Sequence, residues 1–202
     1  MKVKVTFMEE LLGTACNNPE VHEEFIASRS ADAEKMKEEL AALPADELVE
    51  KGMTIFPRDE QGNPFLFDYQ LKGFFKDSCS ALGRVETSES KKLKAYKKII
   101  DGLIFVKPRK ILLQLPAGGA IGNCQRPLRA QTAQGERIAL ANSETVPTGT
   151  SFEMEVLMMD PGLENAMMEW LNYGEFRGLG QWRNSGKGRF TYELLDKPCK
   201  KK

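Results

Sequence analysis

Alternation of apolar and polar residues predicts the strands of this chain. The pattern is most regular at 151–159, where Phe152, Met154 and Val156 fall on one face. A period of two is typical of a strand that buries one side. The expected strands cover residues 3–8, about 103–115 (from two apolar runs, 99–106 and 110–115), 151–159 and 188–195.

Apolar positions at helical spacing predict two helices. The first, 68–82, has Asp68 as its expected N-cap. Its expected buried stripe is Leu71, Phe74, Phe75, Cys79 and Leu82. The second, 162–173, follows Pro161 and is expected to end at Gly174. Its expected inward residues are Leu163, Met167, Trp170 and Leu171. Gly73 inside the first helix costs about 1 kcal/mol relative to alanine, which predicts a packing reason or a ligand close to the backbone there.

The order of these elements is strand, helix, strand, strand, helix, strand. This βαββαβ order predicts an α+β fold with an antiparallel sheet, the ferredoxin-like arrangement that RNA-recognition (RRM-like) modules share. We expect one domain over 1–196 with two insertions. The first, 13–64, is expected to be helical, and the second, 116–149, to be a projecting hairpin. The lysine-rich tail, 197–202, is expected to be disordered.

A glycine-rich stretch precedes the last predicted strand. Glycine lets backbone N–H groups approach a phosphate closely, guanidinium and ammonium groups add charge, and an indole offers a face to a base. This favours a nucleic-acid or phosphate site, although a mobile, merely solvated loop would have the same composition. The residues concerned are Arg177, Gly178, Gly180, Trp182, Arg183, Gly186, Lys187, Gly188 and Arg189.

The chain has 202 residues and no formal net charge, but its charges are segregated. Residues 19–50 hold ten acidic side chains against three basic ones, whereas 91–137 holds eleven basic against two acidic. Such segregation favours a basic surface for an anionic polymer, although a solvated helix face also fits 91–98. The four cysteines are scattered without metal-ligand spacing, so we expect reduced thiols and no metal. With no apolar membrane span or leader visible, we expect a soluble cytoplasmic protein.

Three segments resemble the RAMP superfamily of CRISPR-associated proteins. They are the glycine-rich stretch 174–190, the loop-into-helix stretch 64–76 with its Leu-Lys-Gly, and the Pro-x-Gly-Thr-x-Phe entry into the 151–159 strand. The resemblance implies a guide-RNA-binding backbone subunit whose 116–149 hairpin is the thumb. It implies other effector subunits and head-to-tail copies of the chain as partners, and no cofactor. The implied phosphate contacts beyond the glycine-rich stretch are Lys72, Lys76, Arg126 and Arg129.

The same resemblance leaves two alternatives open. One is the guide-processing endoribonuclease, whose glycine signature is nearly met except that Lys187 replaces an apolar residue. Metal-independent cleavage needs an acid and a base, and the single histidine, His22, lies in an acidic context that suits an ordinary surface position. The other is a stand-alone homologue that binds or mimics an effector complex through its acidic insertion. We expect no catalysis.

Overall fold

The computed structural model describes residues 1–16, 53–132 and 135–196. A four-stranded sheet with the order β11-β1-β10-β6 forms its centre, and every neighbouring pair is antiparallel. These strands are β1 (Lys2–Phe7), β6 (Ile104–Lys107), β10 (Ser151–Met158) and β11 (Phe190–Leu194). The mixed α+β class and the antiparallel sheet expected from the sequence are confirmed, and the order is compatible with a ferredoxin-like fold.

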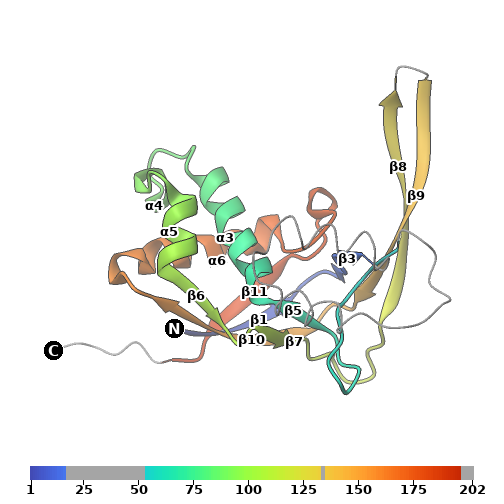
Figure 1. Ribbon diagram of the computed structural model, residues 1–202, viewed down its shortest axis with the longest axis horizontal. Coiled ribbons are helices and arrows are strands. Elements are labelled where there is room, and N and C mark those ends of the chain that lie inside the picture. Colours follow the sequence, from blue (N-terminus) through green and yellow to red (C-terminus); the bar gives the residue numbers. More distant parts are fainter. Residues whose placement is uncertain (17–52, 133–134, 197–202) are drawn as a thin grey trace, which may run out of the picture.

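Helices α3 (Asp68–Leu82) and α6 (Glu164–Arg177) lie on one face of this sheet (Figure 1). The alternation in β10 is confirmed, because Phe152, Met154 and Val156 all face the buried side. Burial of such apolar side chains stabilises the fold by roughly 25 cal/mol per Å² removed from water. The predicted stripe of α3 is also buried, apart from the half-buried Leu82. The inward residues predicted for the second helix are buried throughout.

Two expected helix ends are wrong. Helix α3 has Phe67 as its N-cap rather than Asp68, and the side chain of Gln70 accepts a hydrogen bond from the Phe67 amide at 2.7 Å. Helix α6 does not end at Gly174 but continues to Arg177. A Cβ at Gly174 would lie 2.1 Å from Phe190 Cζ, so this glycine allows the helix to pack closely against β11 and does not end the helix.

The segment between α3 and β10 also differs from expectation. Residues Glu89–Lys92 and Tyr96–Leu103 form helices α4 and α5, so the predicted strand over 99–103 is wrong. Tyr96, Ile99 and Ile100 pack towards the core at helical spacing, which outweighs the β propensity of the isoleucines. A short helix, η1 (Pro161–Leu163), precedes α6.

Strand β7 (Lys110–Leu112) leaves the central sheet and pairs with β5 (Phe65–Phe67). Only the first part of the predicted 103–115 strand therefore belongs to the central sheet. The long hairpin is present: β8 (Gly122–Thr132) and β9 (Gly135–Val146) pair antiparallel and project from the body (Figure 1).

The base of this hairpin is held by short strands. Strand β9 pairs with β2 (Leu11–Leu12) and with β4 (Thr54–Ile55), which in turn pairs with β3 (Ala15–Cys16). The described ends of the predicted 13–64 insertion are thus strands and turns rather than helices. Its predicted helices, His22 and the predicted tail lie outside the described residues. No helix in the described part is long and apolar enough to cross a membrane.

Candidate nucleic-acid interface

The glycine-rich stretch from the last residue of α6 to the residue before β11, residues 177–189, folds back on itself and is called the glycine loop below. Gly178 follows the last residue of α6 with φ of 73°, and the Leu179 amide donates to the Gly188 carbonyl at 2.9 Å. A Cβ at Gly178 would lie 2.6 Å from the Lys187 carbonyl oxygen, and one at Gly188 would collide with the Leu179 carbonyl. Glycine is required at both positions because the two halves of the loop touch through their backbones.

The loop is also packed against the start of the chain. The Gly188 amide donates to the Glu10 carbonyl at 2.8 Å, and a Cβ on Gly180 would lie 2.8 Å from Leu11 Cδ1. Gly186 differs, since a Cβ there would have only Arg189 Cδ within 4 Å, at 3.7 Å. Most of the loop glycines therefore serve close packing within the protein. The exposed residues of the loop are Trp182, Asn184 and Ser185, at and beside the short helix η2 (Arg183–Ser185).

Two of the predicted cations converge on one carboxylate. Asp77 of α3 accepts from Arg177 Nε at 2.9 Å and from Arg183 Nη1 at 2.6 Å, both at Oδ2. Burial alone would raise the pKa of Asp77, but the hydrogen bonds and charges of the two guanidinium groups outweigh it and hold the pKa below its ordinary value. Arg177 Nη1 also donates to Asn184 Oδ1 at 3.0 Å. The three side chains are each about one-third exposed or less, so they form a fixed cluster with one net positive charge.

The other two loop cations are also held within the protein. Lys187 Nζ donates to Glu10 Oε2 at 2.8 Å, and this hydrogen bond raises the pKa of the lysine. Arg189 Nε donates to the Glu175 carbonyl at 2.6 Å. Every basic residue of the loop therefore has a defined position before any ligand arrives.

Arg126 connects the hairpin to the glycine loop. It lies on β8, is 6% exposed, and donates to Ser143 Oγ at 3.1 Å and to Gln181 Oε1 at 2.9 Å. Its guanidinium group also lies 5.3 Å from the ring centre of Trp182. Burial of Arg126 leaves little of its surface for a phosphate, and its contacts position the indole instead.

Trp182 is the exposed aromatic group of the loop. It has φ of 53°, which is uncommon for a residue with a side chain, and it is 41% exposed. The other tryptophan, Trp170, is fully buried. A strained backbone, a cation beneath the ring and an exposed indole together fit a platform on which a base could stack.

The structure does not bring every predicted site residue to this loop. Lys72 and Lys76 lie on another side of α3, where Lys76 Nζ contacts Asp101 Oδ1 at 2.5 Å and Lys72 Nζ donates to the Asp101 carbonyl at 3.2 Å. Burial lowers the pKa of Lys72, although Asp101 acts in the opposite direction. The side chain of Arg129 and the whole of His22 lie outside the described residues.

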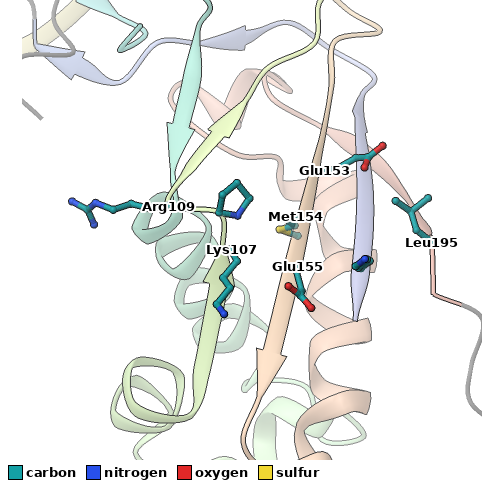
Figure 2. Close-up of a pocket in the computed structure, with 8 residues that line it drawn as sticks. Lys107, Arg109, Glu153, Met154, Glu155 and Leu195 are labelled. Carbon is teal, nitrogen blue, oxygen red and sulfur yellow. The ribbon is translucent and has the colours of Figure 1, made fainter. Parts of the chain in front are cut away.

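The open face of the central sheet is a second candidate surface. A pocket of about 590 Å³ lies on it, and its charged lining residues are Lys2, Lys107, Arg109, Glu153 and Glu155 (Figure 2). The strand register sets Lys2 opposite Glu155 and Glu155 opposite Lys107. Arg109 lies 3.6 Å from Asp68. Because two glutamates face the lysines and Arg109 has its own acidic neighbour, this face has little of the excess positive charge that a polyanion requires.

Sequence reasoning missed the acidic and amide partners that organise the loop. Asp77 is separated from Arg177 by 100 residues, and Glu10 from Lys187 by 177. No local spacing indicates such pairs. The available signal was the position of Glu10 beside the first strand and of Asp77 on the predicted first helix.

Comparison with solved structures identifies the fold. A chain of the Type III-B Cmr-beta complex bound to cognate target RNA, solved by cryo-electron microscopy, superposes with a TM-score of 0.53 over 96% of this chain, at 10% sequence identity. This chain shares the fold of that Cmr-beta chain. The resemblance inferred from the sequence is therefore confirmed at the level of fold, and the chain described here spans 58% of the length of that Cmr-beta chain.

Two further structures are similar at lower scores. A chain of a Type IV-B CRISPR complex has a TM-score of 0.49 and 11% identity, and the match covers 100% of the chain described here and 92% of that chain. Cmr6 from Pyrococcus furiosus has a TM-score of 0.47 and 12% identity, covering 96% and 97%. No protein-family model matches the sequence. No curated protein matches it either.

Proposed function

We propose that this chain is a non-catalytic, RNA-binding subunit of a CRISPR ribonucleoprotein complex and that it holds guide RNA at the glycine loop. The exposed indole of Trp182, next to the Asp77–Arg177–Arg183 cluster, is the observation that carries the proposal. Aromatic stacking tolerates any base, and guanidinium groups bind phosphates without reading sequence. Such a site suits an RNA that is held along its length regardless of its sequence.

The fold supports the same proposal. The strand order with α3 and α6 on one face is compatible with the ferredoxin-like arrangement. The projecting β8–β9 hairpin, which lies in the chain between the central strands β6 and β10, supports the proposal that it serves as a thumb. In this proposal the partners are the guide RNA, other subunits of the complex and further copies of this chain. Lys72, Lys76 and Arg129 would add phosphate contacts away from the loop.

The contributions of the loop residues differ in this proposal. Trp182 stacks on a base, and Arg177, Arg183, Lys187 and Arg189 contact phosphates. Gly178, Gly180 and Gly188 allow the close backbone packing of the loop. Gly186 has no close neighbour, so the turn around it stays accessible. Arg126 contacts the ring of Trp182 and fixes its orientation. The proposal assigns no proton transfer to any of these groups, so the RNA should remain intact.

Indole fluorescence provides a direct test, since the chain has two tryptophans and Trp170 is buried. Titration with a single-stranded RNA of ~40 nucleotides should quench the emission of Trp182. Trp182→Ala should lower the affinity roughly tenfold, in line with about 1–3 kcal/mol for a stacked base. Trp182→Phe should retain more of the affinity than the alanine variant because it keeps an aromatic face.

Two results would contradict the proposal. If RNA neither quenches the indole nor changes the hydrodynamic size of the protein at low salt, where phosphate contacts are strongest, the loop does not hold RNA. If the purified protein cuts the RNA in the presence of a chelator, the endoribonuclease alternative replaces the binding proposal.

A further inference from the structure

A second group of cations lies outside the glycine loop, on α4, α5 and the residues that join them. This group, called the lysine surface below, consists of Lys91, Lys92, Lys94, Lys97 and Lys98. All five side chains are exposed. The glycine loop and the lysine surface lie on different sides of α3 (Figure 1), since Asp77 of that helix faces the loop and Lys76 faces α5.

The lysine surface retains most of its charge. Lys91 and Lys92 have acidic partners, Glu86 at 2.9 Å and Glu89 at 2.6 Å. Within residues 1–16, 53–132 and 135–196, the structure gives no acidic partner to Lys94, Lys97 or Lys98. The nearby carboxylate of Asp101 is already occupied by Lys76.

Helix stability does not explain these lysines. Lys97 and Lys98 lie in the first turn of α5, where the positive end of the helix dipole disfavours cations. An exposed pair of the same charge in this position is unfavourable until an anion approaches. Their position therefore indicates a role outside the folding of α5.

The segment that carries the lysines is attached firmly to the body. The carboxylate of Glu169 on α6 accepts hydrogen bonds from the Glu89 and Ser90 amides, each at 3.1 Å, and from the Ser90 hydroxyl at 2.6 Å. The buried Trp170 donates its Nε1–H to the same hydroxyl at 2.9 Å. The backbone at the start of this segment thus has a fixed place, while the side chains of Lys94, Lys97 and Lys98 are exposed.

The chemistry of the lysine surface differs from that of the glycine loop. Its aromatic residue, Tyr96, is half-buried against the core, so residues 89–98 offer no exposed ring for stacking. Lysine is a flexible point charge that meets phosphates without fixed geometry. A surface of this kind suits a nucleic acid whose phosphates are accessible and whose bases are not.

We propose that the lysine surface binds the phosphate backbone of a double-stranded nucleic acid, separately from the single strand at the glycine loop. Base pairing hides the bases of a duplex and leaves rows of phosphates that three unpaired lysines could neutralise. Each phosphate contact releases condensed counterions, so the interaction should weaken steeply with salt.

The test compares two triple variants with the same change in net charge. Lys94→Gln, Lys97→Gln and Lys98→Gln together remove three charges from the lysine surface. Lys2→Gln, Lys4→Gln and Lys107→Gln together remove three from the open face of the sheet. Binding to a labelled 20-base-pair RNA duplex and to a labelled single strand is measured by fluorescence anisotropy over a range of salt concentrations, and circular dichroism confirms that both variants are folded.

We expect the lysine-surface variant to bind the duplex roughly tenfold more weakly than wild type at low salt, with a salt slope shallower by about 3. Its affinity for the single strand should change less than twofold, and the open-face variant should retain duplex binding. Trp182→Ala should show the reverse pattern. If the wild-type protein binds the duplex but not the single strand, the glycine-loop proposal fails while the lysine-surface proposal stands.

Several results would overturn the proposal. They are a wild-type protein that binds no duplex at low salt, an unchanged duplex affinity in the lysine-surface variant, and an equal loss in the open-face variant. Displacement of the duplex by poly-glutamate as effectively as by unlabelled duplex would assign the surface to acidic proteins instead.

Discussion

The glycine loop and the lysine surface carry the same sign of charge, but the protein holds that charge in two different ways. In the loop, arginines are paired with Asp77 and the backbone is closed upon itself through glycines. On the lysine surface, three ammonium groups extend into solvent from a fixed backbone. The loop can thus present its groups to a ligand at little further entropic cost, whereas the lysines add attraction that depends on salt.

The largest effect is expected where the backbone of the loop closes. Gly188→Ala requires a side chain at φ of 72° and drives its Cβ into the Leu179 carbonyl. We expect the free energy of unfolding to fall by about 3 kcal/mol, as for strain combined with overpacking. Chemical denaturation measures this change.

Gly186→Ala is the matched control, because φ there is 86° but the nearest atom is the flexible Arg189 Cδ. Its cost should be only the backbone strain of about 1–2 kcal/mol. Equal losses of unfolding free energy in Gly186→Ala and Gly188→Ala would mean that the loop is not closed in solution. The loop would then not differ from the lysine surface in holding its charges in fixed positions.

A smaller effect is expected from Asp77→Ala. Because the pKa of Asp77 is held below its ordinary value, its ionised form stabilises the fold above the pKa of the unfolded chain. This contribution disappears as pH falls through the folded pKa. We expect a loss of about 1 kcal/mol at pH 7 for this partly exposed cluster, with the difference from wild type shrinking towards pH 3 in urea titrations. The exposed turn residue Glu60→Gln should show neither effect.

The direction in which Asp77→Ala changes the affinity for single-stranded RNA separates two explanations of how the loop binds it. Charge alone predicts that removal of Asp77 raises the affinity for single-stranded RNA. If the carboxylate positions Arg177 and Arg183, the affinity should fall instead. A rise would show that the loop attracts RNA by charge, as the lysine surface is proposed to do.

The smallest effect is expected on α3, beside the lysine surface. The sequence predicted a packing or ligand-related reason for Gly73, but a Cβ there meets nothing within 4 Å. Gly73→Ala should therefore stabilise the fold by up to about 1 kcal/mol. Unchanged nucleic-acid binding would agree with the present assignment, whereas weaker binding would place a ligand against this helix.

The local hydrophobic pattern was sufficient to predict those helices and strands that bury one face against the core. The alternation in 151–159 and the stripe from Leu71 to Cys79 predicted β10 and α3, since burial and period agree there. The local pattern gave the wrong secondary structure where tertiary contacts decide between helix and strand. The isoleucines at 99 and 100 favour a strand by propensity, yet they lie in α5 because they pack towards the core.

The candidate site was predicted by composition but not by geometry. The sequence predicts that the glycines of 178–188 let the backbone approach a phosphate, whereas Gly178 and Gly188 mainly allow the backbone of the loop to touch itself. The family resemblance implies a phosphate contact for Arg126, whereas the structure buries this side chain against Trp182. Such differences depend on partners distant in sequence, which one chain without its fold does not reveal.

Strand β9 runs without interruption from the far part of the hairpin to its pairing with β2 beside the glycine loop. The hydrogen bond from Arg126 on β8 to Gln181 joins the base of this hairpin to the residue preceding Trp182. We therefore expect a partner that displaces the hairpin to change the orientation of the indole as well.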